Sequence, residues 1–211
     1  MTTAIWWIRR DLRLTDNQAL TAALDSAAEV IPVFIVDPTL LTSPYVGSKR
    51  LAFLWDGLRQ LEADLQARGS CLILRRGNPQ VELGQLLSES GAEAIFAEED
   101  VSPYARHRDN RTAELLPLHL VSGLTVQPPE AVLKADGTPY TVFTPFSRAW
   151  KALPLPTARQ ILPAPTLILT PTRAFSSQSI PTEPDLPASV PFRPGEAEAQ
   201  RRLAAFGGGE D

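Results

Sequence analysis

The sequence predicts an α/β fold: an open, five-stranded parallel sheet with helices on both faces, similar to a Rossmann fold. Up to about residue 153, short runs of β-branched and aromatic residues alternate with longer segments of helical period. Residues 30–36 are apolar at nearly every position, which is typical of a strand buried on both faces. Ten of the twenty prolines lie between Pro154 and Pro194, so we place the end of the sheet domain near residue 153.

The predicted strands and helices alternate regularly through this domain. The strands are expected at residues 4–8, 30–36, 71–74, 94–97 and 118–126, and the helices at 16–27, 48–69, 79–90 and 103–115. Thr15 or Asp16 can cap the first helix and Ser48 the second. Asn78 precedes a proline that suits the first helical position of the third, and Gly91 suits its left-handed end.

Two shorter helices are predicted after the sheet, at residues 144–153 and 196–206. The last one carries Leu203 and Phe206, and the sequence shows no partner for them. We therefore expect an α/β domain at residues 1–153, a Pro-rich interdomain linker at 154–194 and the start of a truncated second domain at 195–211. The alternative is a natural tail that folds back on the sheet domain.

Composition excludes several classes of protein. The chain has 211 residues, 44% of them hydrophobic, and a net charge of −4, which excludes a globally basic nucleic-acid binder but permits a local arginine patch. Cys71 is the single cysteine, and a zinc site would have to combine His107 and His119 with carboxylates, so we predict neither a disulfide nor a metal site. The N-terminus does not resemble a signal peptide, and no apolar run approaches membrane-spanning length. A cytoplasmic protein is expected.

The candidate site lies in the loops that follow the strands, because ligands of open parallel sheets bind at the carboxyl ends of the strands. The loop at residues 9–17 carries Arg9, Arg10 and Arg13 around Asp11. Such a cluster either binds a phosphate or forms a structural network with the aspartate, and we favour the network. Nucleotide-binding glycine motifs and a nucleophile elbow are both lacking, so no catalytic residue is predicted.

Two further charged segments have alternative interpretations. Glu98, Glu99 and Asp100 could form a carboxylate site, but a solvated loop is favoured. The predicted helix at 103–115 carries four basic residues, Arg106, His107, Arg108 and Arg111. A solvated helix face is the favoured reading of that group, and a phosphate-binding patch is the alternative.

Four segments, in order, resemble the DNA photolyase/cryptochrome family. They are Trp6-Trp7-Ile8-Arg9-Arg10-Asp11-Leu12-Arg13-Leu14-Thr15-Asp16-Asn17, Val33-Phe34-Ile35-Val36-Asp37-Pro38, Asp100-Val101-Ser102-Pro103-Tyr104-Ala105-Arg106 and Tyr140-Thr141-Val142-Phe143-Thr144-Pro145-Phe146-Ser147-Arg148-Ala149-Trp150. The run Pro194-Gly195-Glu196-Ala197 looks like the start of the flavin domain of that family. The resemblance extends from about Ala4 to Phe206 and is strongest to class I cyclobutane pyrimidine dimer photolyases.

The resemblance implies that this chain is the N-terminal, light-harvesting antenna part of a photolyase. In the family, FAD and the flipped-out dimer bind a helical C-terminal half, which should lie beyond residue 211. We therefore expect contact with damaged DNA only through that half, a monomeric parent enzyme and no repair by this chain alone. The alternatives are a cryptochrome-type photoreceptor fragment and a freestanding small-ligand binding module.

The resemblance also implies an antenna pocket, formed by Phe34, Asp37, Val46, Arg50 and Asp100. Apolar side chains would contact a planar ring, and the charged ones would bind its polar edge. An alternative for Arg50 is a surface ion pair with Asp56 or Asp100. Folate-binding members have an Asn-Glu pair where this chain has Tyr104-Ala105, which favours a deazaflavin of the 8-hydroxy type, or a flavin in its place, over methenyltetrahydrofolate; an empty pocket is also possible.

Overall fold

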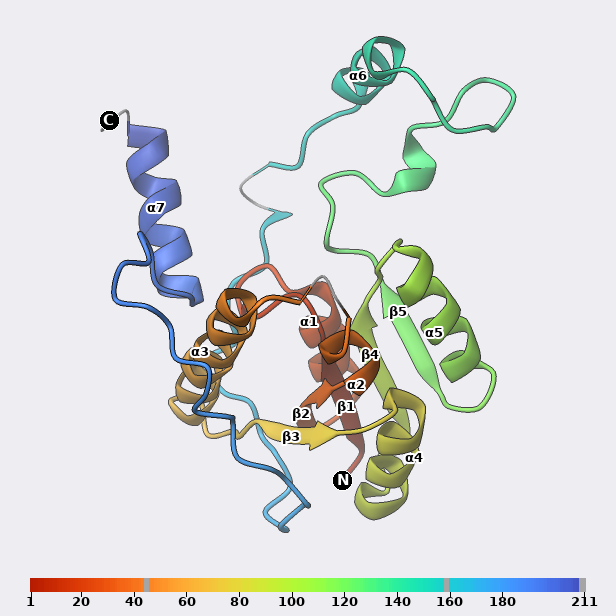
Figure 1. Cartoon of the computed structure of the whole chain (residues 1–211). Coiled ribbons are helices and arrows are strands. Elements are labelled where there is room, and N and C mark those ends of the chain that lie inside the picture. The colour runs from red at the N-terminus through yellow and green to blue at the C-terminus, as the bar shows by residue number, and fades with distance from the viewer. Residues whose placement is uncertain (44–45, 158–159, 209–211) are drawn as a thin grey trace.

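The computed structural model describes residues 1–43, 46–157 and 160–208, and it has the predicted α/β architecture (Figure 1). Five parallel strands form one sheet: β1 (Thr3–Ile8), β2 (Glu29–Val36), β3 (Ile73–Arg76), β4 (Ala94–Glu98) and β5 (Leu118–Val121). Their spatial order is β3-β2-β1-β4-β5. The fold class and the five strands are therefore confirmed.

Helices cover both faces of this sheet (Figure 1). They are α1 (Gln18–Ser26), α2 (Pro38–Leu41), α3 (Ser48–Gln66), α4 (Pro79–Ser90) and α5 (Pro103–Ala113), followed outside the sheet by η1 (Pro129–Ala131), α6 (Phe143–Ala152) and α7 (Glu196–Gly208). Helices α1 and α3 lie on one face, and α4 and α5 lie on the other. None of the described helices is long and apolar enough to cross a membrane.

The core has two halves because successive side chains of a strand point to opposite faces of the sheet. Trp6 of β1 packs with Leu20 of α1 and Leu58 of α3, whereas its neighbour Ile5 packs with Leu83 of α4 on the other face. All six residues of β1 are buried. The nearly continuous apolar strands of the sequence follow from this double coverage.

The helix termini test the predicted caps. The side chain of Asn78 caps α4 and Gly91 ends it with a positive φ of 66°, as predicted. The first helix is instead capped by Asn17, whose side chain accepts a hydrogen bond from the Leu20 amide at 2.8 Å. Asp16 has a φ of 54°, a left-handed conformation that keeps it out of the helix. Ser48 lies inside α3, which has no side-chain cap.

Strand β3 begins and ends two residues later than predicted. The predicted strand ends before Arg75, a charged residue of a type that rarely lies in a buried strand. Arg75 is nevertheless buried, and it forms ion pairs with Glu82 and Glu89 of α4. These contacts between elements let the strand continue through Arg76 alongside β2.

Part of the Pro-rich segment packs against the sheet domain. Ile168 is fully buried in the core half that α1 and α3 cover, and its amide donates to the Arg68 carbonyl at 2.9 Å. The amide of Val30, the second residue of β2, donates to the Leu169 carbonyl at 2.7 Å. The proposed division into domain, linker and second domain stays a prediction, but residues 168–169 belong structurally to the sheet domain.

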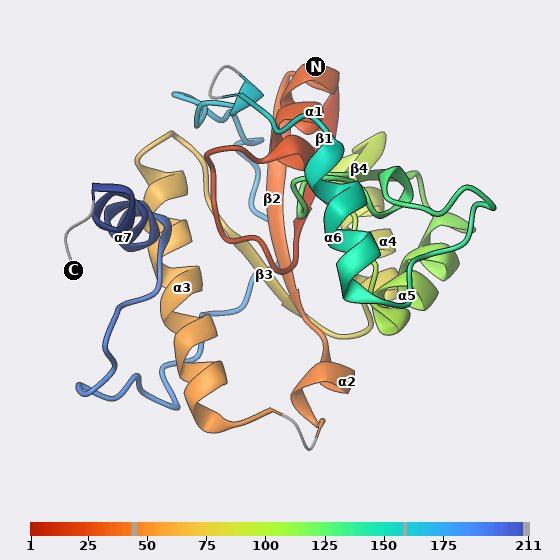
Figure 2. The same ribbon diagram turned by 90° about the horizontal axis from the view of Figure 1, so that it is seen from above.

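Helix α7 lies beside α3 in both ribbon views (Figures 1 and 2). The Glu196 carboxylate accepts hydrogen bonds from the amides of Leu14 at 2.7 Å and Thr15 at 3.0 Å. The expectation that this helix finds no partner was therefore wrong for its first turn. The local sequence did not indicate this contact, because it joins residues about 180 positions apart. Leu203 and Phe206, further along the helix, remain exposed.

Candidate functional site

Two cavities of at least about 300 Å³ open at the carboxyl edge of the sheet, where ligands of open parallel sheets bind. The first, which we call the Asp37 cavity, has a volume of about 300 Å³ and lies between the starts of α2 and α4 and one side of α5. The second, the Asp100 cavity, has a volume of about 330 Å³ and lies among the loops that follow β1, β4 and β5. Strands β1 and β4 are neighbours although two other strands separate them in sequence, so the second cavity lies at the topological switch point.

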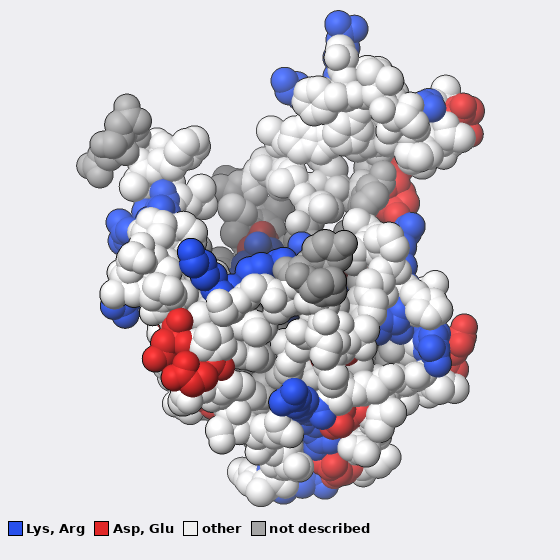
Figure 3. Space-filling model, viewed as in Figure 1, with Lys and Arg blue, Asp and Glu red and all other residues white. Residues whose placement is uncertain are grey.

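The face seen in Figure 3 is hollowed above this edge, between α7 and the projecting segment that carries α6. Basic side chains gather at the hollow. Arg10, in the loop after β1, is a basic residue with 68% of its side chain exposed. The net charge of −4 thus conceals a local basic region, which the composition left open.

A buried arginine cluster supports the edge. The Asp109 carboxylate of α5 binds two guanidinium groups, Arg9 Nη1 at 2.6 Å and Arg108 Nε at 2.8 Å. Both guanidinium groups lie over the Trp7 ring, at 4.9 Å and 4.8 Å from its centre. Burial lowers the pKa of Arg9, against the opposing effect of Asp109. The predicted pairing of arginines with Asp11 is confirmed for Arg13, which lies 3.3 Å from that carboxylate. The other two arginines of the loop pair elsewhere, Arg9 with Asp109 and Arg10 with Asp100.

Asp37 joins the end of β2 to α5. It follows the last residue of β2 and caps α2, and it accepts hydrogen bonds from the Thr39 amide at 2.9 Å and from the Tyr104 hydroxyl. Burial raises the pKa of the Tyr104 phenol, and the adjacent carboxylate raises it further. The phenol therefore keeps its proton and donates its hydrogen bond to Asp37. This bond fixes the Asp37 carboxyl group at one end of the Asp37 cavity.

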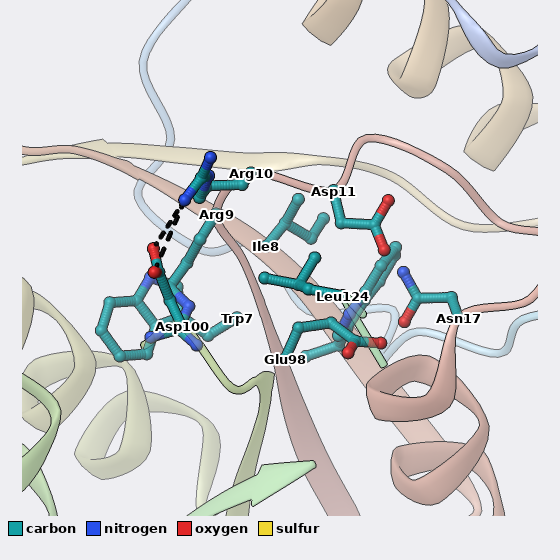
Figure 4. A pocket seen from close by; sticks show the side chains of 10 residues that line it. Trp7, Ile8, Arg9, Arg10, Asp11, Asn17, Glu98, Asp100 and Leu124 are labelled. Atoms are coloured by element: carbon teal, nitrogen blue, oxygen red, sulfur yellow. Dashed lines mark hydrogen bonds and ion pairs between the residues drawn. The ribbon is translucent and has the colours of Figure 1, made fainter. Parts of the chain in front are cut away.

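Asp100 has a different environment, in the loop after β4 (Figure 4). It accepts a hydrogen bond from the Ser102 amide at 2.9 Å and lies 3.4 Å from the Arg10 guanidinium. Burial opposes ionisation, but the bonds from Ser102 and the charge of Arg10 hold the pKa of Asp100 below its ordinary value. Asp100 thus presents a charged carboxylate to its cavity.

Two of the five predicted antenna residues line these cavities, Asp37 the first and Asp100 the second. Phe34, Val46 and Arg50 do not line either of these two cavities. Phe34 is buried in the core half under α1 and α3. The antenna pocket formed by all five residues remains a proposal.

The surface pairing considered for Arg50 stays a prediction. Arg50 is an exposed residue near the start of α3. Asp56 pairs with Arg59 at 3.5 Å, and Asp100 pairs with Arg10. Both carboxylates thus have an arginine partner other than Arg50.

Helix α5 contributes more to the site than its sequence pattern indicates. The pattern favours a solvated face for Arg108, but this side chain lies over Trp7 and Tyr104 and lines the Asp37 cavity. The buried residues Ala105, Asp109 and Thr112 are spaced by four and three positions. That spacing marks a buried stripe on the helix and could have indicated the inward-facing Asp109.

Two further carboxyl groups, those of Glu98 and Asp11, lie in the same region as Asp100 (Figure 4). Glu98 is buried, and Asp11 is half-buried and lines the Asp100 cavity. Glu98 is the last residue of β4, and it is buried and accepts a hydrogen bond from the Ala19 amide at 3.2 Å. The prediction of a solvated loop was therefore wrong for this residue. Burial raises the pKa of Glu98. Burial also raises the pKa of Asp11 to about 6; Arg13 opposes this shift, and Glu98, Glu196 and Asp16 add to it.

The raised pKa of Asp11 predicts a pH-dependent stability. The folded chain binds the Asp11 proton more tightly than the unfolded chain, so this group makes the chain less stable as pH rises from about 4 to about 6. We expect Asp11→Asn to gain about 2–3 kcal/mol of stability relative to the wild type between pH 4 and pH 7.5. Urea unfolding at both pH values measures this difference, with the exposed Asp25→Asn as control. A difference between Asp11→Asn and wild type that does not change with pH would contradict the assignment.

The fold is an α/β domain with two cavities at the carboxyl edge of its parallel sheet. Residues 4–166 match the family model described as DNA photolyase. An uncharacterized 31.6 kDa protein of Synechococcus sp. strain PCC 6716 is 37% identical, over 96% of this chain and 74% of that protein. This chain therefore belongs to the DNA photolyase family.

Two further comparisons place the chain against longer relatives. A deoxyribodipyrimidine photo-lyase of another Synechococcus strain is 34% identical over 96% of this chain and 44% of that enzyme. The crystal structure of a class III photolyase from Agrobacterium tumefaciens superposes with a TM-score of 0.86 and 29% identity, over 97% of this chain and 44% of that one. The chain thus spans less than half the length of these photolyases and corresponds to their α/β domain.

Proposed function

We propose that this chain is the light-harvesting part of a deoxyribodipyrimidine photolyase and binds an antenna chromophore at the carboxyl edge of its sheet. The observation that carries the proposal is the pair of cavities of about 300 Å³ and 330 Å³ at this edge, in a domain of the DNA photolyase family. Both cavities fall within the usual size of small-molecule sites. Asp37 and Asp100 would bind polar edges of the chromophore, and Arg50 would reach it from α3.

A deazaflavin is the favoured chromophore in this proposal. Tyr104-Ala105 stands where folate-binding members have Asn-Glu, and the Tyr104 hydroxyl is already bonded to Asp37. Repair of cyclobutane dimers, FAD binding and contact with damaged DNA are assigned to the helical half of the parent enzyme. The class I assignment belongs to the same proposal.

Reconstitution tests the proposal directly. We expect the purified chain to bind an 8-hydroxy-5-deazaflavin with a visible absorption band, and to bind methenyltetrahydrofolate more weakly. Arg50→Ala and Asp100→Ala should each weaken deazaflavin binding by about 1–3 kcal/mol, because each removes a charge-assisted contact. Lys49→Ala, next to Arg50 on α3, is the matched control and should leave binding unchanged. Unchanged affinity in both site variants would contradict the pocket assignment.

A second candidate is a freestanding ligand-binding module without photochemistry. The similarity to the 31.6 kDa Synechococcus protein favours it, because this chain covers 74% of that protein. The reading frame beyond residue 211 distinguishes the two candidates. A helical flavin domain there supports the photolyase, and a short tail supports the module.

A further inference from the structure

Helix α7 is joined to the loop after β1 by polar contacts. No residue between 196 and 207 is buried. The Glu196 carboxylate accepts the hydrogen bonds from the Leu14 and Thr15 amides. The Gln200 side chain donates to the Thr15 hydroxyl at 3.3 Å. Contacts that bury little apolar surface are among the first that a protein opens, so the docking of α7 depends strongly on the charge around Glu196.

A glycine separates α7 from an anchored residue. Pro194 is buried and faces Gly57 of α3. Gly195, between Pro194 and the helix, has a φ of 119°, in the region that favours glycine. The backbone can therefore change direction at Gly195 while Pro194 keeps its place. This arrangement allows α7 to leave the loop without any change in the sheet.

Asp11 is placed to change the charge around Glu196. It lies in the same loop, with 11% of its side chain exposed, and its Oδ2 accepts no hydrogen bond from any residue that the structure describes. Arg13 Nε lies 3.3 Å from this oxygen, but the same guanidinium also lies 3.8 Å from Asp16. Glu98 of β4 and Glu196 of α7 act on Asp11 as further negative charges. One arginine thus faces several carboxyl groups.

Protons reach Asp11 from solvent, because this residue lines the Asp100 cavity. The other charged residues of the lining are Arg10, Glu99 and Asp100, and Arg10 pairs with Asp100 at 3.4 Å. With its pKa raised to about 6, Asp11 is neutral at pH 5 and ionised at pH 7.5. Ionisation therefore adds a negative charge to this region without unfolding the loop.

We propose that the proton on Asp11 is a switch for α7: the helix docks against the loop after β1 while Asp11 is neutral, and ionisation of Asp11 loosens it. Ionised Asp11 repels the Glu196 carboxylate and so weakens its bonds to the two amides. The coupling is reciprocal, because a docked Glu196 favours neutral Asp11. Since α7 borders the hollow above the carboxyl edge (Figure 3), the switch moves one wall of that hollow.

Distance measurement between α3 and α7 tests the switch. Spin labels are placed on Ala63→Cys and Ala204→Cys, both exposed positions, in a Cys71→Ser background of the full chain. We expect the ratio of docked to undocked molecules, measured by double electron–electron resonance, to fall about tenfold between pH 5 and pH 7.5.

Two further variants connect this change to Asp11. With Asp11→Asn the helix should stay docked at both pH values, which also separates Asp11 from the histidines that titrate in this range. The control Asp25→Asn, at an exposed carboxylate of α1, should behave as the wild type. Circular dichroism checks that each variant is folded at both pH values. A docked fraction that does not change with pH, or that changes equally in Asp11→Asn, would overturn the proposal.

A second measurement does not require Asp11→Asn to fold. Carbon-13 NMR of the Asp11 carboxyl group should show a lower pKa in Glu196→Gln than in the wild type, because the loss of this charge and of docking both favour ionised Asp11. Glu198→Gln is the matched control on α7, since its carboxylate pairs with Arg201 and Arg202 of the same helix. An unchanged Asp11 pKa in Glu196→Gln would show that the two groups are not coupled and would end the proposal.

Discussion

Asp109→Ala is expected to lower the free energy of unfolding by about 3–5 kcal/mol, a large effect for a single side chain. Asp109 has 2% of its side chain exposed and binds both Arg9 and Arg108. Its removal leaves two buried guanidinium groups against one indole ring, without the carboxylate that neutralises one of them. Repulsion between the two cations adds to the free-energy cost of their desolvation. Both effects act on Arg9, because burial and the charge of Arg108 each lower its pKa.

Urea unfolding at neutral pH measures this cost. Arg108→Ala provides the comparison, because it removes one cation and leaves Asp109 paired with Arg9, so its cost should be smaller than that of Asp109→Ala. The exposed Asp25→Ala is the control for loss of a surface carboxylate. A cost for Asp109→Ala no greater than that for Asp25→Ala would show that the cluster is not a stabilising element.

Ile168→Ala is expected to destabilise the chain by about 2–5 kcal/mol, the usual cost of truncating a fully buried aliphatic side chain. Ile168 is 0% exposed and packs with the core half under α1 and α3. Its neighbour Leu169 is 51% exposed and provides a matched control at the adjacent position. We expect Leu169→Ala to cost well under half as much, because it leaves no cavity.

The comparison of these two variants also tests how far the sheet domain extends. Thermal or urea unfolding should show a large loss for Ile168→Ala and a small one for Leu169→Ala. Equal, small losses would show that the Pro-rich segment is a linker with no role in the core. Unequal losses would place the end of the folding unit after residue 168, beyond the boundary drawn from proline content.

Local sequence signals predicted most of the elements well. Helix α4 begins after Asn78 and ends at Gly91 because both caps are properties of single residues and their immediate neighbours. The periodic stripe of α3 and the apolar strands β1 and β2 were equally local signals. Errors occurred where a distant contact changed the local preference, as for Arg75 in β3 and for Asp16 before α1.

The candidate site shows the same division. Strand order and the motif residues indicated the correct edge of the sheet, and Asp37 and Asp100 do line cavities there. The sequence did not indicate that two cavities exist, that Phe34 packs into the core, or that α5 forms one cavity wall. Cavities depend on how side chains from several elements fill space, which no single segment specifies.

The sequence alone determined the α/β class, the alternation of strands and helices, and the resemblance to the DNA photolyase family. These features depend on periodicity, capping residues and motifs, each of which involves only a few neighbouring positions. Three-dimensional packing alone decides that Arg9 pairs with a carboxylate 100 residues away, that Glu196 holds α7 against the loop after β1, and that Ile168 completes the core. The reason is physical: ion pairing and burial depend on distance in space, and the chain brings these groups together only once the sheet has formed.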